Sequence, residues 1–227
     1  MLRRLTWGTD RAGALSRSGA AVALALLAVS CSSGDSGSQV EGLCGQPAES
    51  AAGKSLRDVL GTDDFTAEAT MSDDRFAEKF KKDLKEWQGG PNSTSPFFLC
   101  KYLPDDSGER VLLSFAWSPA EQPQKTRTGG GTVYDVSGAT GSPGHLAAEL
   151  FTPCTLGGEL SEPSQKAVLR ADATLTVDRG RTVDQQRQET ELSFLYLMTR
   201  EATEVLGCEN KPLTKDPIVK PLTESTP

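Results

Sequence analysis

The 227-residue chain contains few of the residues that build catalytic centres and nucleic-acid interfaces. Aromatic residues make up 6% of it, His145 is its only histidine, and its formal net charge is −7. An acidic chain without a long basic cluster repels a phosphate backbone and cannot neutralise several phosphates at once. We therefore expect no nucleic-acid partner, and the low aromatic content predicts a modest core with many loops.

Motifs for metal ions, nucleotides and nucleophilic catalysis are also missing. The spacings between successive cysteines after Cys31 are 56, 54 and 54 residues, so no CxxC pair exists for zinc. The three Asp-Asp pairs, at 63–64, 73–74 and 105–106, lack the alternating oxygen ligands of a calcium loop, and AGKS at 52–55 lacks the earlier glycine of a phosphate-binding loop. No serine or cysteine motif identifies a nucleophile for His145. The sequence thus predicts no metal site, no cofactor and no catalytic residues.

The apolar run near the N-terminus is too short to cross a bilayer, which takes about 20 residues. It reads GAAVALALLAV, eleven residues at 19–29, and it follows a basic segment. The first thirty residues carry a net charge of +3, so the remainder of the chain carries −10. A basic stretch before a short apolar run is typical of a secretory signal peptide, which we place at 1–30.

The residues that end this run, Leu27-Ala28-Val29-Ser30-Cys31, resemble the lipobox of bacterial lipoproteins, although Ala28 stands where that family usually has leucine. In the family, the cysteine thiol is alkylated with diacylglycerol and the peptide before it is removed. The resemblance implies cleavage between Ser30 and Cys31, a lipid on Cys31, and anchoring at the extracytoplasmic face of the cell membrane. Two acyl chains suffice for stable anchoring. The alternative is that Cys31 ends a signal sequence by chance.

A tether rich in glycine and serine is predicted at 31–43, between the anchor and the folded part. Chains of this composition are flexible, and the expected r.m.s. span of this one is about 20 Å. The tether contains GDSG at 34–37, which matches four residues of trypsin-like proteases. That chemistry needs a serine held rigidly beside a histidine and an acid, so we interpret the match as chance.

Apart from Cys31, four cysteines remain, an even number that suits disulfide bonding in the oxidising space outside the cytoplasm. Four cysteines allow three pairings. Each half of the chain reads as cysteine, strand, amphipathic helix and cysteine, which suggests an internal strand–helix duplication. This order favours Cys44 with Cys100 and Cys154 with Cys208, while a free buried thiol remains the alternative for any of them.

Hydrophobic periodicity predicts an α+β domain over 44–210. Helices are expected at 48–60, 72–88 and 182–206. Strands are expected at 64–71, 109–119, 132–138, 145–154 and 166–178. We predict one antiparallel sheet of about five to six strands, with two main amphipathic helices on one face. Thr182 and Gln185 are expected to form the capping box of the last helix. Residues 211–227, which contain four prolines and lack periodicity, are interpreted as a Pro-rich flexible tail.

The sequence offers few candidates for a binding surface. Trp117 and Tyr134 lie on neighbouring predicted strands and would line a binding face together with a long loop at 118–131. The alternative is that both aromatic side chains pack in the core. The order of lipobox, tether, widely spaced cysteines and strand–helix units is similar to small actinobacterial lipoproteins of largely unknown function. That resemblance implies a cellular location but no particular ligand or reaction.

We therefore expect a lipid-anchored extracytoplasmic protein that is not an enzyme. Its expected role is to bind an unknown protein, glycan or small molecule, and its lipid makes the membrane a partner. The alternative is an envelope hydrolase whose site uses His145 and nearby carboxylates, because histidine is the commonest general base in enzymes.

Overall fold

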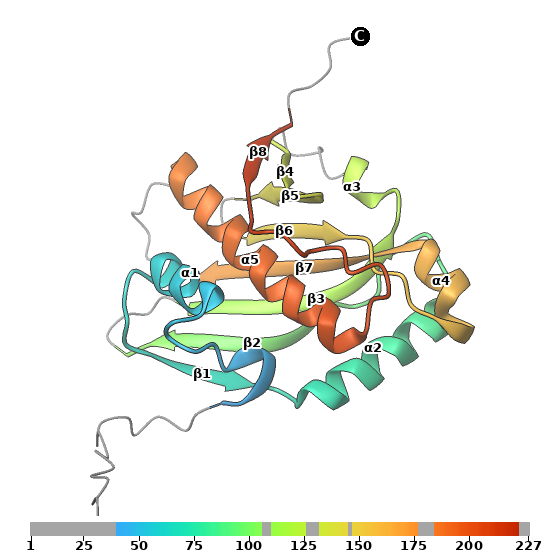
Figure 1. Ribbon diagram of the computed structural model, residues 1–227, viewed down its shortest axis with the longest axis horizontal. Coiled ribbons are helices and arrows are strands. Elements are labelled where there is room, and N and C mark those ends of the chain that lie inside the picture. The colour runs from blue at the N-terminus through green and yellow to red at the C-terminus, as the bar shows by residue number, and fades with distance from the viewer. Residues whose placement is uncertain (1–39, 106–109, 126–131, 145–146, 177–183, 223–227) are drawn as a thin grey trace, which may run out of the picture. The chain divides into compact units, whose positions relative to one another are not determined.

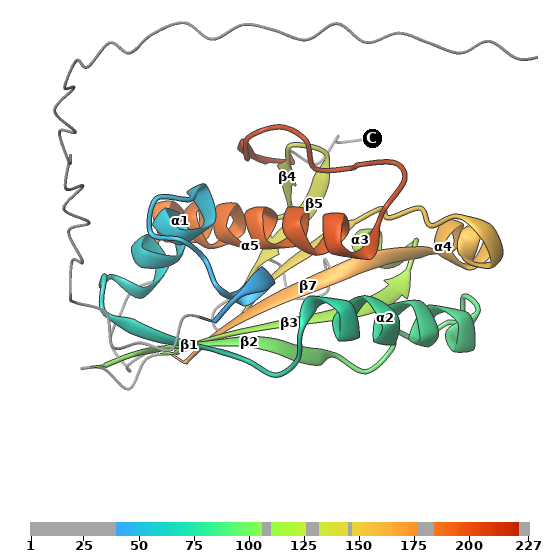
Figure 2. The same ribbon diagram turned by 60° about the horizontal axis from the view of Figure 1, so that its bottom comes forward.

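Eight antiparallel strands form one sheet, in the order β1-β2-β3-β7-β6-β5-β4-β8, and the long helices lie against one of its faces (Figures 1 and 2). The computed structural model describes residues 40–105, 110–125, 132–144, 147–176 and 184–222. The α+β class and the single antiparallel sheet agree with the sequence, but the prediction of five to six strands was wrong. The expected strands correspond to β1, β3, β4, β6 and β7. The strands that were missed are β2, β5 and β8, of which β5 and β8 read as turns and tail.

The strands follow the order of the chain. They are β1 (Phe65–Ala69), β2 (Phe97–Pro104), β3 (Arg110–Pro119), β4 (Tyr134–Val136), β5 (Ala139–Pro143), β6 (Ala147–Thr152), β7 (Ala167–Thr176) and β8 (Val219–Pro221). The longest pairing joins β3 to β7 over ten residues, from Arg110 opposite Thr176 to Pro119 opposite Ala167. This central ladder positions the side chains on both faces of the sheet, because successive residues of a strand point to opposite faces.

The helical segments are likewise given in chain order. They are η1 (Gly42–Cys44), α1 (Ala51–Leu60), α2 (Asp73–Trp87), α3 (Gln122–Lys125), η3 (Gly158–Leu160), α4 (Ser161–Gln165) and α5 (Gln185–Leu206). Ser50 caps α1 by accepting a hydrogen bond from the backbone N–H of Gly53 (2.9 Å). Gly61 and Gly207 end α1 and α5 in the left-handed conformation, with φ of 72° and 76°.

The N-terminal cap of α5 is Asp184 rather than the predicted Thr182. The Asp184 carboxylate accepts a hydrogen bond from the backbone N–H of Arg187 (2.8 Å), and Gln185 is the first helical residue. Because an N-cap residue bonds the N–H two or three positions later, Gln185 is too close to the helix start to play the Glu/Gln role of a capping box. Thr182 itself lies outside the described residues.

The core is a single apolar layer between the sheet and its helices. Phe76 and Phe80 of α2 lie over Phe115 of β3, with ring centroids 5.4 and 6.4 Å from it. Tyr102 of β2 meets Phe194 of α5 edge-on, with 6.1 Å between the ring centroids. Edge-to-face aromatic pairs at these distances add to the stabilisation that comes from burying their area.

Strand β5 belongs to the glycine-rich stretch that the sequence presents as turns. Its Gly141 lies directly beneath α5, where an added Cβ would come within 2.8 Å of Cδ2 of Leu192. A glycine inside a strand often marks such a close approach of another element. The residue that weakens the strand pattern in the sequence is therefore the one that lets α5 pack on β5.

The domain extends beyond the predicted limits of 44–210 at both ends. Before Cys44, the side chain of Leu43 is buried, so part of the predicted tether at 31–43 packs onto the domain. After residue 210, Leu213 is buried, the Tyr196 hydroxyl donates to the carbonyl oxygen of Lys215 (3.0 Å), and β8 pairs with β4. The prediction of a flexible tail at 211–227 is thus wrong for residues 211–222. Residues 31–39 and 223–227 lie outside the described residues.

Both disulfides join the pairs favoured by the sequence. Cys44 in η1 is bonded to Cys100 in β2, and Cys154, which follows β6, is bonded to Cys208, which follows α5. The two halves of the chain are nevertheless arranged differently. The first predicted unit contributes β1, an edge strand, whereas the second contributes β7 at the centre of the sheet. The described residues therefore do not place the two strand–helix units equivalently.

We predict that each disulfide can be removed separately at a measurable cost in stability. The bridges close loops of 56 and 54 residues, for which the chain-entropy model gives about 4 kcal/mol each. The double variants Cys44→Ser/Cys100→Ser and Cys154→Ser/Cys208→Ser should each lower the free energy of unfolding by about 2–4 kcal/mol in urea denaturation. Reduction should add two hydrogens per bridge to the intact mass. An unchanged mass after reduction would contradict the bonding.

Candidate functional site

The aromatic binding face expected from the sequence does not exist. Trp117 is fully buried, and its indole N–H donates to the backbone oxygen of Phe80 (2.9 Å) in the core. Tyr134 is 3% exposed, and its hydroxyl donates to Oε1 of Gln188 in α5 (3.5 Å). Both side chains therefore serve core packing, the alternative reading of these residues. The expected loop at 118–131 is also shorter than predicted, since 118–119 end β3 and 122–125 form α3.

Three of the predicted site residues lie outside the described residues. They are Ser30 and Cys31, at the expected cleavage and lipidation site, and His145, the expected centre of a hydrolase site. The lipid anchor and the alternative hydrolase site accordingly remain predictions.

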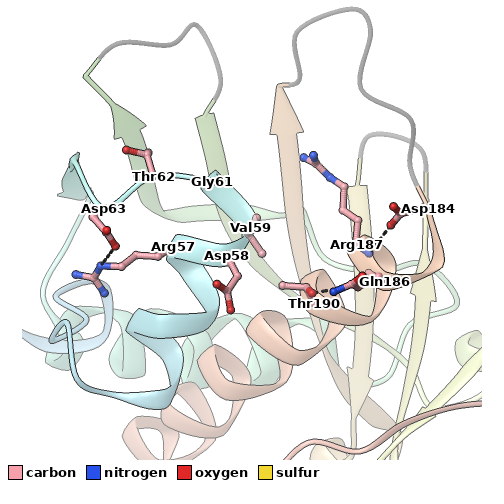
Figure 3. Close-up of a pocket in the computed structure, with 10 residues that line it drawn as sticks. All are labelled: Arg57, Asp58, Val59, Gly61, Thr62, Asp63, Asp184, Gln186, Arg187 and Thr190. Carbon is pink, nitrogen blue, oxygen red and sulfur yellow. Dashed lines mark hydrogen bonds and ion pairs between the residues drawn. The ribbon is translucent and has the colours of Figure 1, made fainter.

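A pocket of about 700 Å³ lies between the C-terminal end of α1 and the first turns of α5 (Figure 3). We call it the α1–α5 pocket. Its lining consists of Arg57, Asp58, Val59, Gly61, Thr62, Asp63, Asp184, Gln186, Arg187 and Thr190. Charged and polar side chains dominate this lining, and the volume is in the range of small-molecule sites.

The α1 wall of the pocket is built around Arg57. Its guanidinium contacts the Asp63 carboxylate at 3.1 Å and donates to the carbonyl oxygens of Ala48 (3.2 Å) and Gly53 (2.9 Å). It also lies 5.6 Å from the ring centroid of Phe65, within cation–π range. Arg57 and Asp63 thus satisfy each other and give this wall a defined shape.

The α5 wall is built around Arg187, whose side chain is mostly buried. Its Nε donates to Oε1 of Glu191 (2.9 Å), one turn further along the helix. Burial raises the pKa of the Glu191 carboxyl, and the hydrogen bond and charge of Arg187 oppose that rise. The two terminal nitrogens of Arg187 have no partner among the described residues and remain available to a ligand.

Two further side chains of the lining are unengaged. Within the described part of the chain, no hydrogen bond or ion pair involves the Asp58 carboxylate or the Gln186 side-chain amide. Figure 3 shows Asp58 between α1 and the first turns of α5, with Gln186 on the α5 side. The pocket therefore presents an open carboxylate on one wall, and an open guanidinium and an amide on the other.

A second polar site lies on the face of the sheet opposite the long helices. There, Asp172 of β7 stands directly across from Ser114 of β3 and from Glu149 of β6. The Asp172 carboxylate contacts Nε of Arg170 at 3.1 Å and accepts a hydrogen bond from the Ser114 hydroxyl (3.5 Å). We call Glu149 and Asp172 the carboxyl pair.

Burial is the main reason why the carboxyl pair titrates unusually. It raises the pKa of both Glu149 and Asp172. The negative charge of Asp172 and a hydrogen bond to it raise the pKa of Glu149 further, whereas Arg170 opposes the rise at both carboxyls. The hydrogen bond between the two carboxyls thus raises the pKa of Glu149 and lowers that of Asp172.

The described residues contain no group of three or more histidine, cysteine, aspartate or glutamate side chains placed to hold a metal ion. Among the helices in the described ranges, none is both long and apolar enough to span a bilayer. Comparison of the chain with protein-family models, with curated proteins and with solved structures finds no match.

Sequence reasoning missed both polar sites for different reasons. Asp58 and Arg187 are 129 residues apart in the chain and carry no motif, so no local signal points to the pocket. Asp172 was visible as a polar position on an alternating strand, together with Arg170. Its partner Glu149 could not be found in the same way, because the register of β6 against β7 was unknown.

We predict that Glu149→Gln reduces the loss of stability with rising pH. A carboxyl whose folded pKa is raised contributes stability below its unfolded pKa of about 4.3, and this contribution is lost as pH rises through the folded pKa. Glutamine can still donate to Asp172 but cannot ionise. The melting temperature of the parent should therefore fall more between about pH 4.5 and about pH 8 than that of the variant.

The matched control for this measurement is Glu78→Gln on α2. Glu78 is exposed, and its carboxylate has no partner among the described residues. The control should follow the pH profile of the parent. A Glu149→Gln profile as steep as that of the parent would contradict a raised pKa at Glu149.

Proposed function

We propose that this chain is a lipid-anchored, extracytoplasmic binding protein whose ligand occupies the α1–α5 pocket. The observation that carries the proposal is the pocket itself, which both Asp58 and Arg187 line. Among the described residues, the Asp58 carboxylate and the terminal nitrogens of Arg187 have no protein partner. Preorganised hydrogen-bonding groups that converge on a concave site are typical of ligand recognition. The charges of Arg57 and Asp63 neutralise each other and hold one wall in place.

The proposed location has separate support in the cysteines. Cys44–Cys100 and Cys154–Cys208 are within bonding distance, and disulfides persist mainly in oxidising compartments outside the cytoplasm. The lipobox-like sequence before Cys31 supplies the anchor, and a short stretch then leads to the folded domain that begins near Val40. On this proposal, the domain is displayed at the outer surface of the cell membrane.

The alternative function, an envelope hydrolase, is favoured by one observation, the carboxyl pair. Two carboxyls of different pKa that share a proton are found at sites of acid–base catalysis. Glu149 lies on β6, four positions after His145 in the chain. In a hydrolase site that uses His145, the carboxyl pair would therefore supply the carboxylate partner. Activity that survives Arg187→Lys but is lost in Glu149→Gln would favour the hydrolase over the binding protein.

We predict that Cys31→Ala abolishes lipid attachment. In the producing bacterium, the parent should fractionate with the membrane and carry a diacylglycerol mass on its N-terminal cysteine. The variant should lack that mass and keep its leader, because the lipoprotein signal peptidase acts after the thiol is modified. The measurement is mass spectrometry of the N-terminal peptide together with membrane fractionation.

The control for the anchor is Ser38→Ala, a change of similar size within the predicted tether. It should mature and fractionate as the parent does. An unmodified cysteine at the mature N-terminus of the parent, or maturation of Cys31→Ala at the same position, would refute the anchor.

A further inference from the structure

The α1–α5 pocket carries open charges of both signs on opposite walls. Asp58 projects from α1, and Arg187 and Gln186 belong to the first turn of α5 (Figure 3). The other charged groups of the lining are engaged elsewhere. Arg57 pairs with Asp63, and Asp184 caps α5. Among the described residues, the groups left for a ligand are therefore the Asp58 carboxylate on the first wall and, on the second, the Gln186 amide and the terminal nitrogens of Arg187, whose Nε is paired with Glu191.

The α5 wall is suited to an anionic group. The first turn of a helix concentrates unpaired backbone N–H groups and the positive end of the helix dipole. Arg187 adds terminal guanidinium nitrogens to this end, and Glu191 holds the guanidinium in place through Nε. A carboxylate or phosphate can receive two parallel hydrogen bonds from such a guanidinium.

The α1 wall is suited to a cationic group. The Asp58 carboxylate is exposed, and a ligand ammonium group can approach it without displacing a protein partner from the described chain. Asp63 keeps its ion pair with Arg57, so Asp58 is the acceptor left on this wall. An ammonium group bound to Asp58 also lies on the opposite side of the pocket from the positive end of the α5 dipole, which limits the repulsion between the two.

A ligand with a single charge would be attracted to one wall of this pocket and repelled by the like charge on the other. A simple anion on Arg187 would lie in the field of Asp58, and a simple cation on Asp58 would lie in the field of Arg187. A ligand that carries both signs satisfies both walls, and its discrimination against singly charged analogues comes partly from these repulsions. The electrostatic arrangement of the pocket is therefore complementary to a zwitterion.

We propose that the α1–α5 pocket binds a small zwitterion, with its anionic group on Arg187 and Gln186 and its ammonium group on Asp58. The inference deepens the proposed binding function and rests on it. Amino acids and short peptides offer this chemistry with a carboxylate, and phosphoethanolamine offers it with a phosphate. The pocket volume of about 700 Å³ admits any of them.

The test is isothermal titration of the full chain, purified in detergent from whichever cell fraction contains it, with four probes. Glycylglycine and phosphoethanolamine are the zwitterions, and acetate and ethylamine are the singly charged analogues. We expect at least one zwitterion to bind about tenfold more tightly than either analogue, which corresponds to about 1.4 kcal/mol. The better zwitterion identifies whether the anionic group is a carboxylate or a phosphate.

Two variants test the two walls without disturbing the fold. Asp58→Asn removes the open carboxylate, and Gln186→Glu places a negative charge where the ligand anion should bind. Neither side chain has a partner among the described residues, and a glutamate in the first turn of a helix is favourable to it. Each variant should weaken zwitterion binding about tenfold, whereas Glu78→Gln on α2 should leave it unchanged.

The inference is overturned if neither zwitterion binds more tightly than acetate and ethylamine, or if both variants bind as the parent does. Its failure is distinguishable from failure of the proposed function. If a neutral ligand such as sucrose bound the parent but not Asp58→Asn, the proposed binding function would stand and the zwitterion inference would be overturned. An unmodified Cys31 would remove the anchored location and leave these titrations unaffected.

Discussion

The burial of α5 against the sheet fixes where the neighbouring elements of the domain can lie. Residues 194–198 are buried on every side of the helix, so α5 needs cover from more than the sheet. That cover comes from α1, α2 and the chain that follows α5, including the Lys215 carbonyl that binds Tyr196. Gly141 allows the close contact with β5. Because the middle turns of α5 are enclosed in this way, the helix is fixed against the sheet and the other helices.

The two ends of α5 have different roles, one in stability and one in the pocket. The C-terminal end is tied to the loop after β6 through Cys154–Cys208, a covalent link that limits fraying of the helix. The N-terminal end lies beside α1 and forms the wall of the pocket. There, buried Glu191 orients Arg187, and Asp184 satisfies a backbone N–H of the first turn. A rigid helix thus supplies preorganised charge to the pocket, which lowers the entropic cost of ligand binding.

The two faces of the sheet serve different physical purposes. The face toward the helices is apolar and includes Phe115 and Trp117 of β3. On the opposite face of the same strand, Ser114 begins a polar row that continues through Asp172 and Glu149. The alternation of side chains along a strand makes this separation possible. Partial burial raises the pKa values of both carboxyls, and the nearby Asp172 raises that of Glu149 further, which makes this face sensitive to pH.

The elements that could be predicted from the amino-acid sequence are those with strong periodicity or distinct caps, namely α1, α2, α5, β3 and β7, together with the favoured cysteine pairs. Local signals suffice for them, because a helical stripe or an alternating strand is written within a few turns of chain. Packing between distant parts of the chain decides that β5 and β8 are strands and that Trp117 is buried. That Asp58 and Arg187 line one pocket depends on helix packing, and that Glu149 lies opposite Asp172 depends on strand register. Both are set by contacts between residues far apart in the chain, which no local pattern encodes.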